Sequence, residues 1–225
     1  MTAAFITGAG TGVGKTFIAC GLIRHYRRHG RSVSAIKPIV SGFDPAAPSG
    51  SDPALLLDAL GQECNAVTLE RVSPWRFLAP LSPDMAARAE SRPIDFQAVS
   101  AFCRASMAQA KGTLLIEGIG GIMVPLDARH TVLDLMIAVK APVVLAGGSY
   151  LGALSHILSA QEVILRNGLD LCAIAVSESE GSEVPFDETL VSLGHFAKAP
   201  LLALVRQDRE GKNTGVFQRL GDLIA

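Results

Sequence analysis

The sequence predicts an α/β protein with a mostly parallel sheet that is covered by helices on both faces, and three observations support this fold class. Apolar runs of strand length alternate with helical patterns along the chain. Several of these runs are apolar throughout, which is typical of strands that have no wet face. A glycine-rich stretch, residues 8–16, separates the first strand-like run from the first helical pattern.

The expected elements follow one another in a regular order. Strands are expected at residues 3–7, 34–40, 113–117, 142–147, 171–177 and 201–205. Helices are expected at residues 14–29, 52–60, 82–90, 94–110, 131–139, 154–167 and 186–195. Pro83 and Pro93 are interpreted as helix openings, because proline suits the first helical turn. The stretch 43–51, rich in proline, glycine and small residues, is expected to be a surface loop.

Size and charge bound the class of protein. The chain has 225 residues, of which 49% are hydrophobic and 18% charged, so residues 1–225 are expected to form one α/β domain with a substantial core. The net charge is −1 and most basic residues are scattered. We therefore expect no nucleic-acid partner. A small arginine cluster between residues 24 and 31 is interpreted as a solvated helix end that suits the helix dipole.

Cysteine spacing and hydropathy indicate a cytoplasmic protein with no membrane partner. The four cysteines lie far apart without a C-x-x-C pair, as in reduced proteins. A strand is expected directly at the N-terminus, so no signal peptide is predicted. The most apolar stretch, residues 132–146, is interrupted by Asp134, Lys140 and Pro142. It is therefore expected to be a helix, a turn and a buried strand.

The stretch 8–16 reads GAGTGVGKT and has the strand–loop–helix setting of a P-loop NTPase-like fold. Its four glycines allow backbone N–H groups to approach phosphate oxygens closely. Lys15 would place a charge on the β- and γ-phosphates, and Thr16 would offer its hydroxyl to magnesium. The usual spacing has its first glycine where this chain has Ala9. The alternative is a structural turn that binds nothing, but such a turn needs neither four glycines nor a lysine.

Further catalytic groups are expected just after strands, because ligands bind at the carboxyl ends of such sheets. Lys37 would bring a second positive charge to a phosphoryl group or an anionic substrate, or else its stem would snorkel to water. Glu117 ends a strand before a glycine turn and is either a metal ligand or a stabiliser of that turn. Asp52 begins a helix, where it is either a cap or a metal ligand. Thr16, Asp52 and Glu117 together would supply the few oxygen ligands that magnesium takes from protein.

A second glycine turn, residues 147–153, also joins a strand to a helix but lacks a lysine. Its helix start would hold a carboxylate or phosphate, or the turn is only structural. The five histidines show no metal-ligand spacing, and no serine lies in a nucleophile elbow. Zinc chemistry and hydrolytic triads are therefore excluded.

Several motifs together resemble the dethiobiotin synthetase family in type and order. They are residues 8–16, 37–42 (KPIVSG), 51–52, 80–83, 117–121 (EGIGG) and 124–126. The resemblance extends to about Asn167 and is most specific at residues 37–42 and 117–121. It implies ATP- and Mg²⁺-dependent closure of a cyclic urea on 7,8-diaminononanoate with CO2 or bicarbonate, which gives dethiobiotin, ADP and phosphate in biotin biosynthesis. The implied route runs through a carbamate and a mixed anhydride with phosphate.

The resemblance also implies roles for residues and a homodimer that completes the substrate pocket. Lys15 and Lys37 would be catalytic, and Thr16, Asp52 and Glu117 would hold the metal. The nucleotide would contact Thr11, Gly12, Val13, Gly14, Lys15, Thr16, Asp52, Glu117, Gly118, Gly120 and Ser177. The substrate would contact Thr11, Ser41, Leu151 and Gly152.

Three departures from the family pattern bear on specificity. Ser177-Glu178 replace a common Asn-Asp pair near the nucleotide base, and Val205-Arg206-Gln207 replace a more apolar stretch. The choice of base is therefore left open. Tyr150 replaces a frequent lysine before the second glycine turn, which leaves open how the substrate carboxylate is held.

Two other classes share the phosphate loop. A cobyrinic acid amide synthase would carry a further glutamine-hydrolysing domain, for which this chain has no room. A partitioning ATPase of the ParA or MinD kind would place a lysine early in the loop, where this chain has Gly10. Such switch proteins also carry a basic patch or an amphipathic terminal helix, whereas residues 213–225 are short and only weakly basic.

Overall fold

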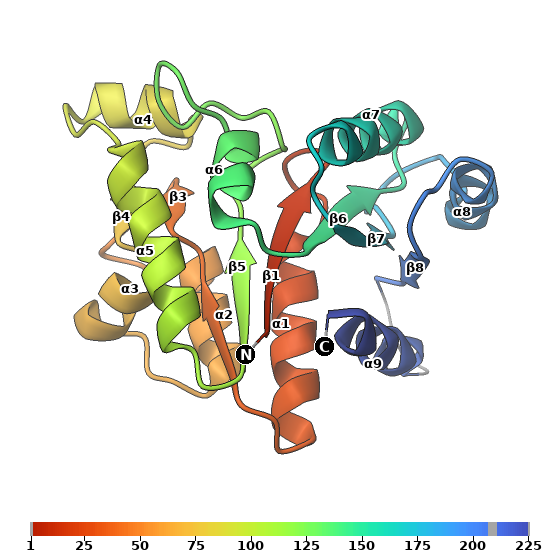
Figure 1. The fold of residues 1–225 in the computed structure, drawn as a ribbon, viewed down its shortest axis with the longest axis horizontal. Helices are drawn as coiled ribbons and strands as arrows, with labels where there is room; N and C mark the ends of the chain where they lie inside the picture. The colour runs from red at the N-terminus through yellow and green to blue at the C-terminus, as the bar shows by residue number, and fades with distance from the viewer. Residues whose placement is uncertain (1, 207–210, 225) are drawn as a thin grey trace.

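A computed structural model describes residues 2–206 and 211–224, and its centre is a parallel sheet of six strands in the order β2-β5-β1-β6-β7-β8 (Figure 1). The sheet strands are β1 (Thr2–Gly8), β2 (Val33–Ile36), β5 (Thr113–Glu117), β6 (Val143–Gly148), β7 (Leu171–Ser177) and β8 (Leu201–Leu204). All five strand pairings are parallel. The predicted sheet is thus confirmed, and its carboxyl edge carries the loops that begin α1, α6 and α7.

The helices of the described residues surround this sheet. They are α1 (Lys15–Arg28), α2 (Asp52–Leu60), α3 (Ala66–Val72), α4 (Pro83–Ala89), α5 (Phe96–Gln109), α6 (Val132–Val139), α7 (Ala153–Arg166), α8 (Phe186–Gly194) and α9 (Lys212–Ile224). The seven predicted helices are confirmed to within two residues at each end, and the loop 43–51 is confirmed as well. The helices α3 and α9 were not predicted from the sequence.

The prediction that Pro93 opens a helix was wrong. The helix α5 begins at Phe96, because the Asp95 carboxylate accepts hydrogen bonds from the N–H groups of Gln97 (2.9 Å) and Ala98 (3.2 Å). A carboxylate at this position satisfies N–H groups that have no partner inside the helix. Pro93 would suit the first turn of a helix, but its side chain cannot accept hydrogen bonds from these N–H groups, so the helix begins after Asp95 instead.

Alternate residues of each central strand enter two separate cores. In β1, Phe5 joins the core formed with α5, α6 and α7, whereas Ala4 and Ile6 join the core formed with α1, α2 and α9. In β5, Leu114 and Ile116 share the core of Phe5, while Leu115 enters the opposite one. This period of two explains why the strands are apolar at every position.

The prediction of one strand over residues 34–40 was wrong, because the chain leaves the main sheet after Ile36. Pro38 has no N–H to donate to a sheet ladder. The Lys37 N–H instead donates to the carbonyl of Val72 (2.9 Å), outside the sheet. Beyond the break, β3 (Ile39–Ser41) pairs in parallel with β4 (Trp75–Phe77), a short strand that was not predicted. Lys37 therefore lies at a strand exit, where catalytic groups are expected.

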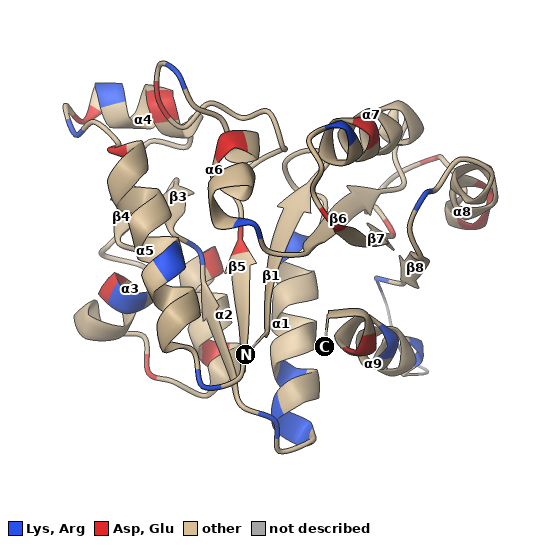
Figure 2. Cartoon of the chain, in the orientation of Figure 1, with Lys and Arg blue, Asp and Glu red and all other residues tan. Residues whose placement is uncertain are grey.

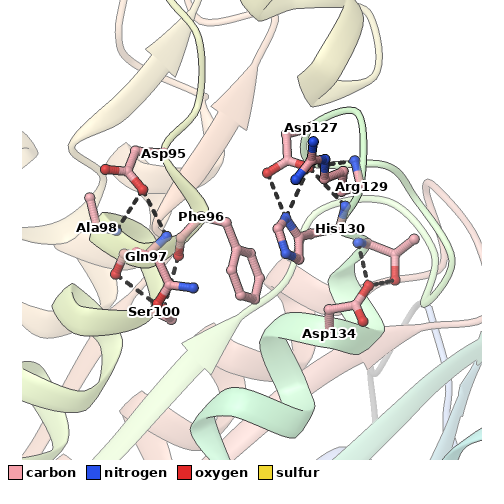
Figure 3. A network of polar contacts seen from close by, with 10 residues as sticks. Asp95, Phe96, Gln97, Ala98, Ser100, Asp127, Arg129, His130 and Asp134 are labelled. Atoms are coloured by element: carbon pink, nitrogen blue, oxygen red, sulfur yellow. Dashed lines mark hydrogen bonds and ion pairs between the residues drawn. The ribbon is translucent and has the colours of Figure 1, made fainter.

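A polar network ties α5 to the loop before α6 (Figure 3). The ring of Phe96 stacks on His130, with ring centroids 4.0 Å apart. The His130 Nδ1 lies 2.8 Å from the Asp127 carboxylate. The Asp134 carboxylate accepts hydrogen bonds from the N–H (2.7 Å) and the hydroxyl (2.8 Å) of Thr131. These contacts fix the end of the loop that runs from Glu117 across the carboxyl edge of the sheet.

Charged residues are scattered over the helices (Figure 2). Lys and Arg gather at the last turn of α1, where Arg27 and Arg28 lie at the negative end of the helix dipole. Acidic and basic residues also occur close together at the carboxyl edge, at the end of β5 and the start of α1. Of the helices that the structure describes, none has the length and apolar character needed to cross a bilayer.

We expect Asp134→Ala to lower the free energy of unfolding by about 1 kcal/mol, because carboxylates that cap a helix start contribute about 0.5–2 kcal/mol. Urea denaturation followed by circular dichroism measures the change. Asp187→Ala is the matched control, since Asp187 lies in the first turn of α8, which has no side-chain cap hydrogen bond at its N-cap. Equal losses in the two variants would contradict a capping role for Asp134.

Candidate active site

The phosphate loop joins β1 to α1 and depends on glycine at two positions with left-handed backbone. Gly12 has φ 72° and Gly14, the N-cap of α1, has φ 88°. Gly8 is needed for another reason, since a Cβ there would lie 2.9 Å from the carbonyl oxygen of Gly10. The Lys15 ammonium folds back over the loop and donates to this same carbonyl (2.9 Å). The Lys15 ammonium thus lies against the backbone of the loop.

The sheet register brings the predicted catalytic groups together. Ile36 pairs with Ile116, so the next residues of the two strands, Lys37 and Glu117, lie side by side. The Lys37 ammonium is 2.6 Å from Glu117 Oε1 and 2.9 Å from Asp52 Oδ2. The Thr16 hydroxyl donates to the same Glu117 oxygen (2.7 Å). The start of α1, the exit of β2, the end of β5 and the start of α2 therefore converge on one point at the carboxyl edge.

Both central charges are almost completely buried, with 2% of Lys37 and 1% of Glu117 exposed. Burial disfavours the charged lysine, but the carboxylates of Glu117 and Asp52 outweigh it and raise the pKa of Lys37. For Asp52, burial acts against ionisation, but the Lys37 charge prevails and lowers its pKa. Lys37 does not snorkel to water. The snorkelling alternative is thereby excluded.

Lys15 differs from Lys37 because, among the described residues, no carboxylate is hydrogen-bonded to it. Burial, followed by the positive charge of Lys37, lowers the pKa of Lys15 to about 8. Its hydrogen bond goes to a neutral carbonyl, that of Gly10. A negatively charged phosphate at this position would supply the counter-charge that Lys15 lacks.

Asp52 is not the cap of α2. Ser51 is the N-cap, and its hydroxyl accepts a hydrogen bond from the N–H of Ala54 (3.4 Å). The Asp52 carboxylate turns instead toward Lys37 and Thr16. Glu117 Oε2 is buried and has no hydrogen-bond partner in the described part of the chain. An orphaned carboxylate oxygen beside a hydroxyl and a second carboxylate fits a hard divalent cation such as Mg²⁺.

The magnesium fit rests on two carboxylates and one hydroxyl, which is a small donor set. Within the described ranges, no group of three or more His, Cys, Asp and Glu side chains could hold a metal ion. In many nucleotide-binding proteins, however, magnesium is bound by only one or two protein carboxylates, and its other ligands are waters and phosphate oxygens. Thr16, Asp52 and Glu117 meet that requirement.

A cleft of about 610 Å³ opens beside the phosphate loop, between Gly12–Gly14 and the end of β7. Ser177 lies in it, and its buried Oγ has no hydrogen-bond partner within residues 2–206 and 211–224. The N–H of Arg206 donates to Glu178 (3.0 Å), and the Arg206 guanidinium pairs with Glu180 (2.6 Å). The cleft is continuous with the loop at Val13 and Gly14, so it fits the nucleoside end of a phosphate ligand. Gln207, expected near the base, lies outside the described residues.

A second hollow, the α7 groove, has a volume of about 460 Å³. We define it by Gly10 and Thr11 of the phosphate loop, the turn 121–125, and the face of α7 that carries residues 156, 159, 160 and 163. Gly118 and Gly120 lie in the connection that leads to this turn, and Gly120 has φ 59°. Because the α7 groove lies next to the phosphate loop, it is suited to hold the substrate that accepts the phosphoryl group.

Three predicted substrate residues do not line either hollow. Ser41 ends β3, and Leu151 and Gly152 form the turn before α7. Leu151 is 89% exposed, and Gly152 is the N-cap of α7 with φ 95°. The structure therefore brings together the lysines, the acids and the phosphate loop but leaves these three at the margin of the site.

Comparisons with known proteins show the family to which the chain belongs. A family model described as an AAA domain matches residues 2–213. The ATP-dependent dethiobiotin synthetase BioD of Acidiphilium cryptum is 43% identical over 87% of this chain and 89% of its own length. The enzyme of the same name from Caulobacter vibrioides strain NA1000 is 47% identical over 87% of this chain and 88% of its own length. The chain belongs to the dethiobiotin synthetase family.

Solved structures confirm the fold of this dethiobiotin synthetase family member. The septum site-determining protein MinD of Pyrococcus horikoshii, complexed with Mg-ADP, has a TM-score of 0.59 at 14% identity, over 98% of this chain and 93% of that one. The cell division ATPase MinD of Pyrococcus furiosus has a TM-score of 0.58 at 16% identity, over 100% of this chain and 98% of that one. At such identities the likeness concerns the P-loop NTPase fold alone.

Sequence reasoning missed several residues around the site. His156 lies in the α7 groove, although histidines were considered only as metal ligands. Asn213 clamps Val205 through two hydrogen bonds, from the Val205 N–H (3.0 Å) and to its carbonyl (2.8 Å). Glu180 pairs with Arg206 across the base cleft. Glu180 could have been found from the sequence, because it is a charged residue close to Ser177-Glu178, which were expected near the nucleotide base. Nothing in the sequence marks Asn213.

We expect nucleotide affinity to fall as the pH rises above 8, because Lys15 loses its proton in the free protein while the phosphate-bound form needs it. The dissociation constant should rise by up to about tenfold per pH unit above that value. Calorimetric titration with a non-hydrolysable ATP analogue at pH 7, 8 and 9 measures this. In Lys15→Arg, the guanidinium stays charged and the profile should be flat. A flat wild-type profile would contradict the lowered pKa.

Proposed function

We propose that this chain catalyses ATP-dependent ring closure on 7,8-diaminononanoate with CO2, which gives dethiobiotin, ADP and phosphate in biotin biosynthesis. One observation carries the proposal: a second buried lysine, Lys37, lies beside the phosphate loop together with two acids. Simple nucleotide hydrolysis needs one phosphate-loop lysine. A second cation suits a reaction in which an anionic acceptor and a phosphoryl group must come together.

The reaction would begin with a carbamate formed from one amine and CO2. A carbamate oxygen would attack the γ-phosphorus while the bond to ADP breaks, which gives a mixed anhydride. The second amine would then attack the carbonyl carbon and release phosphate. Two negatively charged groups must meet in the second step, so the main demand on the protein is electrostatic.

Lys15 and Lys37 would meet this demand from two sides. Lys15 lies over the phosphate loop at Gly10 and would neutralise the β- and γ-phosphates. Lys37, held by the two carboxylates in its charged form, would stabilise the charge that develops between carbamate and phosphorus. Thr11 in the α7 groove and Ser41 at the end of β3 would orient the diamine.

Magnesium would be held by Thr16, Asp52 and Glu117, with the free Oε2 of Glu117 as one ligand. When bound, the ion would neutralise phosphate oxygens and polarise the transferring group. The buried position of Glu117 keeps this carboxylate fixed at the strand end.

The nucleotide would extend along the phosphate loop, with Gly12, Val13 and Gly14 at its phosphates and Ser177 toward its base. Glu117, Gly118 and Gly120 would border the phosphates from the neighbouring strand. ATP is the proposed nucleotide because the relatives are named for it. We further propose that the single unit 1–225 works in the cytoplasm as a homodimer, with Leu151 and Gly152 completing the substrate pocket across the dimer face. The strong exposure of Leu151 supports such a contact.

The proposed activity is tested by ADP release from the purified protein. We expect ADP and dethiobiotin to form only when ATP, 7,8-diaminononanoate and bicarbonate are all present, as measured by a coupled assay and mass spectrometry. Parallel reactions with CTP and GTP report the choice of base. ADP release that responds to DNA or lipid but not to the diamine would point instead to a switch ATPase.

We expect Lys37→Ala to lower turnover by about a hundredfold to a thousandfold, or about 3 to 4 kcal/mol, because a preorganised cation is lost. Lys111→Ala, which removes an exposed lysine far from the phosphate loop in sequence, is the control. Melting curves of both variants separate lost catalysis from unfolding, since Lys37 is also the counter-ion of two carboxylates. A folded Lys37→Ala protein with an unchanged rate would remove Lys37 from the mechanism.

A further inference from the structure

Tyr150 and His156 form a polar pair beside the phosphate loop that the reaction described above does not use. The Tyr150 hydroxyl lies 2.9 Å from His156 Nδ1. His156 is in the second turn of α7 and is exposed to solvent, while Tyr150 is half-buried in the turn after β6. The pair therefore joins the two segments that meet at the start of α7.

The backbone on either side fixes the position of the tyrosine ring. A Cβ on Gly148 would lie 2.9 Å from Cδ1 of Tyr150, so this position has room only for glycine while the ring stays in place. On the other side, the hydroxyl lies 3.6 Å from the place of a Cβ on Gly10. Gly10 carries the carbonyl that accepts from Lys15. The hydroxyl thus lies against the middle of the phosphate loop.

His156 contributes the one ionisable side chain among the described residues that line the α7 groove. It stands at the end of the groove near the phosphate loop, close in sequence to Tyr150. Farther along α7, Ser159 adds one hydroxyl to the lining, while Ala160 and Val163 make the wall mostly apolar together with Ile122 and Pro125 of the glycine turn. The groove therefore fits an aliphatic molecule with a polar group at one end.

Tyr150 orients the imidazole ring. If the phenol donates to Nδ1, the proton of a neutral imidazole is held on Nε2. Nε2 then remains as a hydrogen-bond donor, and the groove contains no acidic side chain among its described lining residues. A ligand oxygen would be its partner, and a carboxylate-type oxyanion is the strongest acceptor of this kind.

We propose that His156, oriented by Tyr150, binds a carboxylate-type oxyanion of the aliphatic substrate in the α7 groove. His156 would be a specificity-determining contact, and Tyr150 a positioning residue that acts through it. The inference rests on the proposed function, which supplies two such oxyanions: the carbamate at the reacting end and the carboxylate at the far end of the chain.

The test measures KM and kcat for His156→Ala, His156→Gln and Tyr150→Phe, with 7,8-diaminononanoate and with 2,3-diaminooctane, the same diamine without its carboxylate. We expect His156→Ala to raise KM for 7,8-diaminononanoate by about tenfold to a hundredfold, because a charge-assisted hydrogen bond is lost. KM for ATP should not change. His156→Gln should recover part of the loss, since its amide can donate near the position of Nε2, and Tyr150→Phe should lie between His156→Ala and the wild type.

The two diamines distinguish the sources of the oxyanion. If His156→Ala impairs the use of both diamines equally, the partner is the carbamate. If it impairs only the acid, the partner is the chain carboxylate, and both outcomes support the proposal. Unchanged KM for the diamine, or an equal change in KM for ATP, would overturn it.

Two controls keep this test separate from that of the proposed function. Ser155→Ala changes an exposed neighbour on α7 outside the groove lining, and His195→Gln changes an exposed histidine at the end of α8. Both should behave as the wild type. If the wild type itself shows no diamine-dependent ADP release, the proposed function fails. If the wild type responds to the diamine and His156→Ala does not differ from it, only the present inference fails.

Discussion

The buried ion triad of Lys37, Glu117 and Asp52 is the constraint on which the rest of the site depends. An isolated charge of either sign would be very unfavourable at this depth, whereas each member of the triad compensates another. Such buried ion pairs contribute little net stability compared with apolar packing of similar volume. The triad is therefore better explained as a set of charges that is positioned for the reaction than as a source of stability. It raises the pKa of Lys37 and lowers that of Asp52, so this pair is charged before any ligand arrives.

The order of the strands explains how groups so far apart in sequence come together. Since β5 lies between β1 and β2, the groups that follow these three strands emerge side by side at one edge. Parallel pairing places Glu117 beside Ile6 on one neighbour and next to Lys37 on the other. Thr16 then reaches the same carboxylate from the first turn of α1. The arrangement of the candidate active site is thus a direct result of topology and register, and the connecting segments supply Lys37, glycines and small polar groups.

Much of this arrangement could be predicted from sequence, for physical reasons that also explain the failures. Continuous apolar runs and strand-exit charges are local signals, so the sheet and the positions of Lys37 and Glu117 at its carboxyl edge could be predicted. The choice between cap and ligand for Asp52 depended on whether Ser51 would cap α2, which only the structure decides. The short strand β4 exists only through pairing with β3, which no local pattern shows. The helix α9 contains Gly215 and Gly221, which weaken its helical pattern.

The two-sided sheet has a consequence for how this chain can vary in length. Side chains of β5 alternate between two packed layers. One inserted residue would therefore turn each following side chain to the opposite layer and rotate Glu117 away from its partners. The same change in the surface segment 43–51 would leave both layers intact. Length variation among natural relatives should therefore gather in such peripheral connections, and a library of random insertions should recover working clones there and almost none within the central strands.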